Sequence, residues 1–178
     1  QLVLQGLRMG QLLAAPGAYP SPEQRAALYD AALERCDGLD GVEDGVISNV
    51  KGCHSVFDPT KATRRGEPLR CPSGIAAGPS CLSDAQLAAL AEIDRSYALP
   101  FTLATGDKVL PGFNVYTADT GRPALSRAQG QTTFFAFGTT PPANPASQDG
   151  PYVMLLADQA FKHVIARVTG GEVSTIDG

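Results

Sequence analysis

Three aspartates stand close together in a glycine-rich stretch that two cysteines enclose. Asp37, Asp40 and Asp44 are preceded by Cys36 and followed by Cys53. Crowded carboxylates repel one another unless a cation or hydrogen bonds offset their charge. A hard cation such as Ca²⁺ takes about six to eight oxygen ligands, typically carboxylates, backbone carbonyls and water. The stretch therefore predicts either a calcium site or a polar Asp/Gly turn that holds no metal.

The spacing of these carboxylates differs from that of an EF-hand loop. In an EF-hand the acidic positions recur at every second residue and end in a bidentate glutamate. Here the second aspartate follows the first by three residues, and the third follows by four more. Gly38, Gly41 and Gly45 alternate with the aspartates. Glycines allow the backbone to curl so that carbonyl oxygens turn inward, which a calcium loop of this register would require.

The four cysteines can pair in more than one way. None of their spacings is Cys-x-x-Cys, so a zinc site is a poor fit. Pairing between sequence neighbours closes the shortest loops and favours Cys36–Cys53 and Cys71–Cys81. The alternative is that all the thiols are free in a reducing compartment. Calcium together with paired cysteines indicates a secreted or periplasmic protein.

The stretch Cys-Asp-Gly-Leu-Asp-Gly-Val-x-Asp-Gly-Val-Ile-Ser-Asn with its following cysteine resembles the calcium loop of the tannase and feruloyl esterase family. The match is specific over residues 36–53. It continues more loosely through Phe57-Asp58-Pro59, Cys71, Cys81 and residues 82–86, and it becomes thin in the C-terminal half.

This resemblance implies a set of calcium ligands. They would be the side chains of Asp37, Asp40 and Asp44 together with the backbone carbonyls of Val42 and Val46. The resemblance also implies the same disulfide pairing that loop closure favours.

The resemblance further implies a domain and a partner. In the family such a loop belongs to a lid domain that is inserted into an α/β-hydrolase core. Residues 1–178 would then be a single lid domain, and the core with its Ser, His and Asp would lie outside them. Glycine and proline number 19 and 14, a share that predicts many loops. The expected fold class is α+β, rich in helices and loops, with a small hairpin, the calcium loop and two disulfides.

Two short segments carry the same signal for the start of a helix. In Ser21-Pro22-Glu23-Gln24 and in Ser83-Asp84-Ala85-Gln86, a serine precedes a glutamine by three residues. This is the pattern of a capping box, in which each side chain binds the backbone N–H of the other residue. The first start predicts a helix to about residue 35, which leads into the acidic stretch. The second predicts a helix that continues through residue 97.

The rest of the chain is predicted to hold two more helices, one hairpin and much loop. Apolar residues recur at helical intervals over 2–13 and 151–167. Apolar and β-branched residues flank a Thr-Gly-Asp turn within 101–110, which predicts a hairpin. Prolines and glycines interrupt 54–80, which is expected to be irregular, and 117–150 is expected to be rich in loops.

An aromatic cluster with two nearby arginines could contact an aromatic acid. Phe134, Phe135 and Phe137 form the densest aromatic group in a chain without tryptophan. These rings would either line a wall for an aromatic acyl group or fill the core. Arg122 and Arg127 would either bind a substrate carboxylate in bidentate fashion or lie on the surface as ordinary cations.

The chain has no sequence signal for a hydrolase nucleophile. An α/β-hydrolase places its serine in a Gly-x-Ser-x-Gly elbow between a strand and a helix, and this pattern is absent. The segment Gly78-Pro79-Ser80 lies among loop residues, and neither His54 nor His163 has the sequence context of a catalytic base. We therefore expect the isolated chain to hydrolyse no ester.

These observations predict the substrate-covering lid of a secreted serine carboxylic ester hydrolase, with an aromatic ester as the substrate class that the resemblance implies. The alternative is a free-standing secreted binding or interaction module that calcium and disulfides stabilise. The net charge is −4 without a basic stripe, so a nucleic-acid partner is not expected. No apolar run has the length of a membrane span. The chain starts at Gln1 without a signal-peptide pattern, which indicates a mature product or a piece of a longer protein.

Overall fold

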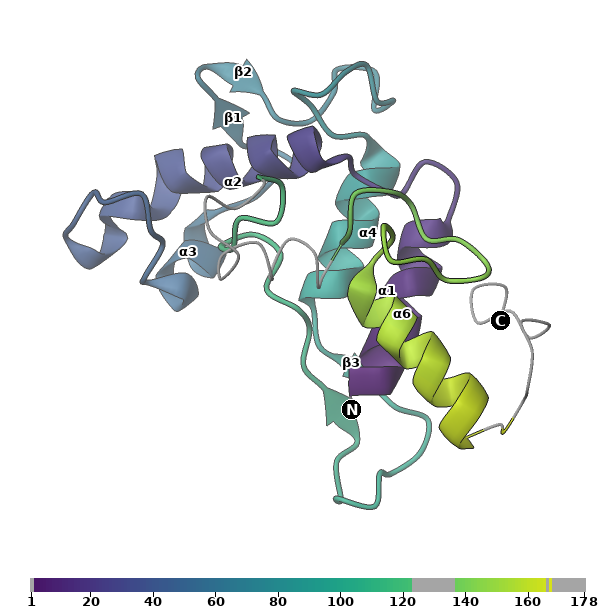
Figure 1. Cartoon of the computed structure of the whole chain (residues 1–178). Coiled ribbons are helices and arrows are strands. Elements are labelled where there is room, and N and C mark those ends of the chain that lie inside the picture. The colour runs from purple at the N-terminus through teal and green to yellow at the C-terminus, as the bar shows by residue number, and fades with distance from the viewer. Residues whose placement is uncertain (1, 123–136, 166, 168–178) are drawn as a thin grey trace.

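The structure is a computed structural model, and it describes residues 2–122, 137–165 and 167 of the chain. Helices dominate it, and two short antiparallel hairpins project from opposite sides of the helical body (Figure 1). The predicted combination of helices, a small hairpin and two disulfides is confirmed. In chain order the elements are α1 (Leu2–Ala14), α2 (Pro22–Cys36), η1 (Asp37–Asp40), α3 (Val50–Val56), β1 (Thr63–Arg64), β2 (Glu67–Pro68), α4 (Asp84–Asp94), β3 (Tyr97–Ala98), β4 (Val109–Leu110), α6 (Tyr152–Gln159) and η2 (Ala160–Ile165).

Both predicted capping boxes are present, and they bind each other. Ser21 and Gln24 begin α2, and Ser83 and Gln86 begin α4, each pair with both reciprocal hydrogen bonds. The side-chain amide of Gln86 donates to the Gln24 side-chain oxygen at 2.8 Å and to the backbone carbonyl of Tyr19 at 3.0 Å. The same glutamine side chains that cap the helices therefore also join their N-termini. A glutamate at position 86 could not do this, because an ionised carboxylate has no hydrogen to donate.

Arg25 of α2 is buried at 1% exposure and binds backbone carbonyls from three other segments. Its guanidinium donates to the carbonyls of Pro20 at 2.7 Å, Thr120 at 2.9 Å and Gly138 at 2.7 Å. Its central carbon also lies 5.1 Å from the ring centre of Phe137. Burial lowers the pKa of the guanidinium. An arginine stays charged in proteins, so these carbonyls and the ring provide the stabilisation that water supplies elsewhere.

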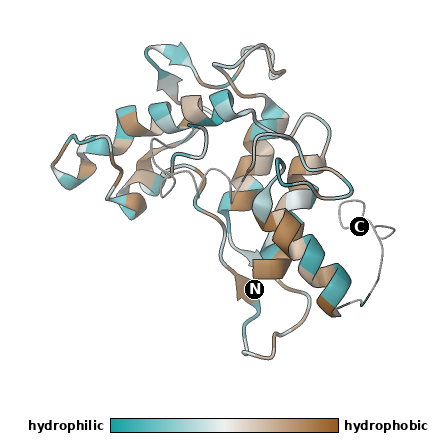
Figure 2. Cartoon of the chain, viewed as in Figure 1, coloured by the Kyte–Doolittle hydropathy of each residue, from teal (hydrophilic) through white to brown (hydrophobic). Residues whose placement is uncertain are grey.

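The main core lies where α1, α2 and α4 meet. Its members on these helices include Met9 and Leu13 of α1, Leu28 of α2, and Leu87, Leu90 and Ile93 of α4. Apolar residues also concentrate on the facing parts of α1 and α6 (Figure 2). Among the described residues, no helix combines the length and the apolar character needed to cross a membrane.

α1 and α6 approach each other closely at two glycines. A Cβ atom on Gly6 would lie 2.6 Å from the carbonyl oxygen of Val153 and 2.8 Å from the Cβ of Ala157. A Cβ on Gly10 would lie 2.6 Å from the sulfur of Met154. The two glycines share one face of α1 because they are four residues apart. In Figure 1 the start of α1 and the end of the α6–η2 segment both lie at the lower side of the view, so the two helices run roughly antiparallel.

Two disulfides are present with the predicted pairing. Cys36 and Cys53 join the end of α2 to α3, with their Cα atoms 5.2 Å apart. Cys71 and Cys81 close a loop ahead of α4, with a Cα separation of 5.0 Å. The first disulfide holds both ends of the acidic stretch.

The stretch predicted to be irregular, 54–80, is more regular than expected. α3 reaches into it because Asn49 caps this helix by accepting a hydrogen bond from the backbone N–H of Gly52 at 2.9 Å. β1 and β2 then pair across a turn in which Arg65 and Gly66 have positive φ angles of 52° and 84°. Neither strand exceeds two residues, so sequence periodicity could not reveal them.

The predicted boundaries of α4 and its following hairpin were wrong. α4 stops before Arg95, whose backbone is extended (φ −77°, ψ 148°). Tyr97 belongs instead to β3 and pairs with Leu110 of β4, so the first strand precedes the predicted range 101–110. The turn at Gly106, with a φ of 90°, and the second strand, β4, lie within the predicted range. Cross-strand pairing here overrides the helical spacing of the apolar residues.

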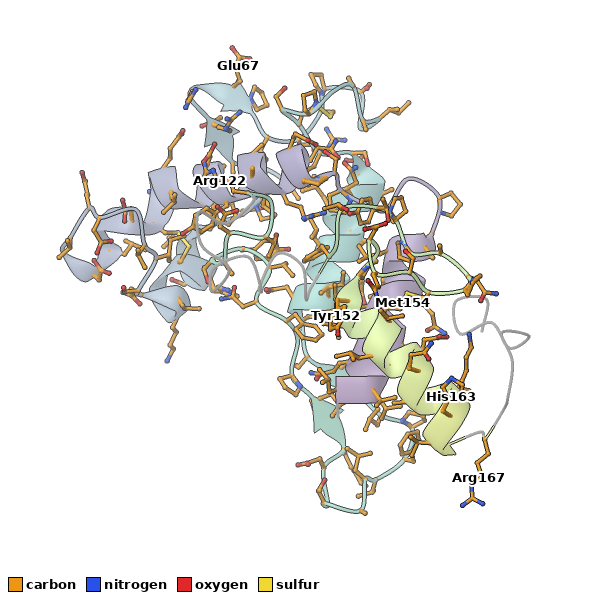
Figure 3. All side chains as sticks on the ribbon, in the orientation of Figure 1. Glu67, Arg122, Tyr152, Met154, His163 and Arg167 are labelled. Carbon is orange, nitrogen blue, oxygen red and sulfur yellow. A yellow bond between two sulfur atoms is a disulfide. The ribbon has the colours of Figure 1, made fainter. Side chains whose placement is uncertain are left out.

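The last predicted helix, 151–167, divides into the α-helix α6 and the π-helical η2. His163 lies on its exposed side (Figure 3), in agreement with the prediction. Lys162 is buried instead, and its ammonium lies 2.9 Å from a carboxylate oxygen of the equally buried Asp158. A buried charge is stable only when it is paired, so Asp158 accounts for the inward position of Lys162.

The α1–α6 contact predicts unequal effects for two alanine substitutions. Gly6→Ala should lower the free energy of unfolding by about 2 kcal/mol, because its methyl group meets backbone and the helices must separate. Gly10→Ala is the matched control and should cost less than about 1 kcal/mol, since the flexible Met154 side chain can move aside and alanine favours the helix. Urea denaturation measures both, and equal losses would contradict this packing.

The burial of the Arg25 guanidinium predicts that substitutions of a buried and an exposed arginine differ in their cost to stability. Arg25→Met should destabilise the fold by about 3 kcal/mol, because the carbonyls of Pro20 and Thr120 lose their guanidinium donor. The carbonyl of Gly138 keeps the Tyr19 hydroxyl as a donor. Arg95→Met removes an arginine from an exposed ion pair with Glu92 and should cost within about 1 kcal/mol. Chemical denaturation of the two variants checks the difference, and a near-neutral Arg25→Met would show that the carbonyl cluster needs no cation.

Candidate functional site

The acidic stretch folds as a short 3₁₀ turn followed by an exposed loop. η1 continues directly from α2 and ends at Gly41, whose φ of 95° lies in the left-handed region. Gly45 has a φ of 78°. An added Cβ would meet nothing at either position, so backbone conformation rather than space requires glycine there. The expectation that glycines curl this backbone is confirmed at these two positions.

Each of the three aspartates binds backbone N–H groups of its own loop. Both oxygens of Asp37 accept from the N–H of Gly45 at 3.1 Å. One oxygen of Asp40 accepts from Val42 at 3.0 Å, and one oxygen of Asp44 accepts from the residue two positions on, also at 3.0 Å. The last two contacts have the geometry of Asx turns. Hydrogen bonds therefore offset part of the negative charge.

The types of donor atom in this loop fit calcium. The loop offers carboxylates and backbone carbonyls, which hard cations prefer. Among the residues that the structure describes, however, no group of three or more His, Cys, Asp or Glu side chains is gathered to hold a metal. Calcium binding by Asp37, Asp40, Asp44 and the carbonyls of Val42 and Val46 stays a prediction.

Tyr29 of α2 connects this loop to the body of the molecule. Its hydroxyl donates to the carbonyl oxygen of Gly45 at 3.3 Å. Burial raises the pKa of the phenol, and the nearby carboxylates of Asp119, Asp37 and Asp44 add to the increase. The spacing of two residues in the sequence could have indicated the contact of Tyr29 with the loop. Tyr29 precedes Cys36 by seven residues, or about two helical turns, and so faces the same side of α2 as the cysteine that begins the loop.

Arg122 lies against the middle of α2 (Figure 3), where it joins a network of charges. Its guanidinium forms ion pairs with Asp30 and, at 3.3 Å, with Asp119. Arg64 pairs with the other oxygen of Asp30 at 2.9 Å. The Arg122 guanidinium carbon also lies 5.9 Å from the ring centre of Tyr29. Because its side chain is 46% exposed, part of the guanidinium still faces solvent.

The other predicted substrate contacts divide into one core residue and three undescribed ones. Phe137 is 1% exposed and belongs to the main core, where Arg25 covers its ring. This position matches the alternative that the ring fills the core, so Phe137 offers no ring face on the described surface. Arg127, Phe134 and Phe135 lie outside the described residues.

Neither histidine contacts a serine hydroxyl in the part of the chain that the structure describes. His54 lies with its Nδ1 atom 3.7 Å from Asp94 and its Nε2 atom 3.3 Å from the side-chain oxygen of Asn114. Burial raises the pKa of the Asp94 carboxyl, and the charge of His54 partly offsets this effect. No serine hydroxyl hydrogen-bonds to His54 or His163 within residues 2–122, 137–165 and 167. Among the described residues, neither histidine therefore has a serine hydroxyl as its partner.

Comparison with known proteins links the whole chain to one group of esterases. A family model described as "Tannase and feruloyl esterase" matches residues 1–177. An uncharacterised esterase of Agrobacterium fabrum is 38% identical over 85 residues, which make up 47% of this chain and 14% of that protein. Mono(2-hydroxyethyl) terephthalate hydrolase of Piscinibacter sakaiensis is 36% identical over 101 residues, or 56% of this chain and 15% of that protein.

Solved structures share the fold but extend far beyond it. Feruloyl esterase B from Aspergillus oryzae superposes with a TM-score of 0.55 at 14% identity, covering 99% of this chain and 29% of that chain. Another esterase from Aspergillus oryzae gives a TM-score of 0.51 at 16% identity, with coverages of 98% and 29%. The chain thus spans a minor part of the length of each of these relatives.

Proposed function

Because the chain belongs to the tannase and feruloyl esterase family, we propose that it is the substrate-covering, specificity-determining lid of a secreted serine carboxylic ester hydrolase. One observation carries this proposal. Nearly all of this chain superposes on feruloyl esterase B, yet it accounts for only 29% of that chain. The remainder of such an enzyme would then supply the α/β-hydrolase core with its Ser, His and Asp.

The arrangement of the end helices supports an inserted domain. α1 and α6 pack at close distance at Gly6 and Gly10, and they run roughly antiparallel in Figure 1. A polypeptide that enters through α1 and leaves after α6 therefore does so on one side of the module. Inserted domains typically have their two ends close together, which allows them to join a host domain without disrupting it.

The lid would act by binding and excluding water rather than by covalent chemistry. Closing elements shield the reacting ester from solvent and help to choose the acyl group. Arg122, Arg127, Phe134 and Phe135 remain the predicted contacts for an aromatic acid ester, and the buried Phe137 is removed from this set. Acyl transfer itself would depend on the serine nucleophile and oxyanion hole of the core. Two disulfides support an exported protein.

Calcium is part of this proposal. It would be held by the carboxylates of Asp37, Asp40 and Asp44 and by the carbonyls of Val42 and Val46. When bound, it would neutralise the crowded carboxylates of the loop. The chain's own contribution is to present these oxygens at the end of a rigid helix, with Cys36–Cys53 holding both loop ends. This preorganisation lowers the entropic cost of calcium binding.

Terbium luminescence tests the calcium loop directly. Tb³⁺ substitutes for Ca²⁺ and emits when a nearby aromatic side chain absorbs light. The chain lacks tryptophan, and Tyr29 donates a hydrogen bond into the loop. We expect tyrosine-sensitised emission that excess Ca²⁺ abolishes, a several-fold loss in Tyr29→Phe, and loss of binding in Asp40→Ala.

Thermal unfolding is a second, independent test of calcium binding. Ca²⁺ at about a hundred times its Kd should stabilise the wild type by about 2.7 kcal/mol, and it should do much less for Asp40→Ala. Glu67→Ala removes a carboxylate that points into solvent from β2 (Figure 3) and should respond as the wild type does. Equal melting with calcium and with a chelator, together with absent terbium emission, would eliminate the site.

The lid proposal predicts that the purified 178-residue chain hydrolyses no aromatic acid ester above the buffer rate. The physical reason is that no serine hydroxyl pairs with a histidine among the described residues. Initial rates with methyl ferulate or an aryl benzoate, with and without a serine-directed inhibitor, provide the measurement. Turnover that the inhibitor abolishes would contradict the proposal, because it would locate a nucleophile within this chain.

A further inference from the structure

A cleft lies between the C-terminal half of α2 and the turn that follows α3. Its volume is about 410 Å³, which falls in the range of small-molecule pockets, roughly 300–1,000 Å³. Ala31, Val56, Phe57 and Ala62 provide apolar surface. Such a cleft can accept the apolar body of a small ligand, and its charged residues decide which polar group that ligand carries.

Three of the four charged side chains of the cleft already have partners. Asp58 and Lys61 form an ion pair at 2.8 Å. Hydrogen bonding from the ammonium of Lys61 lowers the pKa of the Asp58 carboxyl to about 2, so this pair stays ionised and mutually neutralised at neutral pH. Both carboxylate oxygens of Glu34 lie 3.0 Å from the backbone nitrogen of Arg65 and accept its N–H.

Arg35 is the exception. Its guanidinium forms no hydrogen bond or ion pair within the part of the chain that the structure describes, although it lines the cleft. Its place in the last turn of α2 complements the helix dipole but leaves the N–H donors unbonded. A guanidinium presents a planar fork of donors that matches a carboxylate in bidentate fashion.

Arg35 also lines a neighbouring cavity of about 460 Å³, which suits an anion less well. Glu34 lines both spaces, but the neighbouring cavity is also bordered by Asp37 and Glu43. These acidic side chains would repel a carboxylate, and the cavity adjoins the acidic loop. The cleft beside Phe57 is therefore the better position for an anionic ligand.

We propose that the cleft between α2 and the turn after α3 binds a small monocarboxylate with an aromatic or other apolar body, with Arg35 holding the carboxylate. The apolar part would lie against Val56 and Phe57. This site uses none of the predicted calcium ligands or substrate contacts, so it is independent of the lid proposal.

Benzoate is the probe for this site. Amide chemical shifts of the ¹⁵N-labelled chain, followed during a benzoate titration, should change saturably at Ala31, Val56, Phe57 and Ala62. Arg35→Gln should weaken the binding by about tenfold or more, as expected for loss of a charge-assisted hydrogen-bonded pair. Benzamide, which has the same shape without the charge, should bind correspondingly more weakly.

Lys51→Gln is the matched control. Lys51 is an exposed cation of α3 that does not line the cleft, so its loss changes the net charge equally and should leave benzoate binding unaltered. Arg35→Lys keeps the charge but not the fork and should bind with intermediate affinity. Unsaturable shifts, shifts at other amides, or equal weakening in Arg35→Gln and Lys51→Gln would each overturn the proposal.

Discussion

Arg25 carries a positive charge into the interior of the molecule, where no carboxylate of the described residues forms an ion pair with it. Backbone carbonyls of Pro20, Thr120 and Gly138 accept its hydrogen bonds, and these residues belong to segments that are far apart in sequence. A buried charge is tolerated only where such partners are in place. Packing the guanidinium therefore requires the chain before α2, the turn ending at Arg122 and the segment after Phe137 to come together around one helix.

That helix, α2, also positions the two regions with functional predictions, the acidic loop and Arg122. From its C-terminal end α2 leads into the acidic loop, and the Cys36–Cys53 disulfide holds the loop's far end. From its middle, Tyr29 donates to Gly45 and Asp30 pairs with Arg122. The proposed calcium loop and the proposed substrate-facing arginine thus share one rigid support. A change in the position of α2 would move both regions together.

Local signals in the sequence were sufficient for some features and insufficient for others. The serine–glutamine spacing placed the starts of α2 and α4, because a capping box is a contact between residues three apart. Loop closure and the family resemblance placed both disulfides. The hydrogen bond between Gln24 and Gln86 and the burial of Arg25 could not be derived, since each depends on partners far along the chain. The end of α4 was missed for the same reason, because pairing of Tyr97 with Leu110 decided it.

In the candidate site, too, local features could be predicted from the sequence and features that depend on distant residues could not. Gly41 and Gly45 of the acidic loop adopt the conformation that their spacing indicated. The role of Phe137 could not be predicted, because it depends on which residues cover its ring.

The most direct test of the inserted-lid account is the intact mass of the natural polypeptide that contains this sequence, with peptide sequencing of its flanks. The account predicts a product several times longer, with a serine elbow before residue 1 and an aspartate and histidine after residue 178. A natural polypeptide limited to these residues would contradict it.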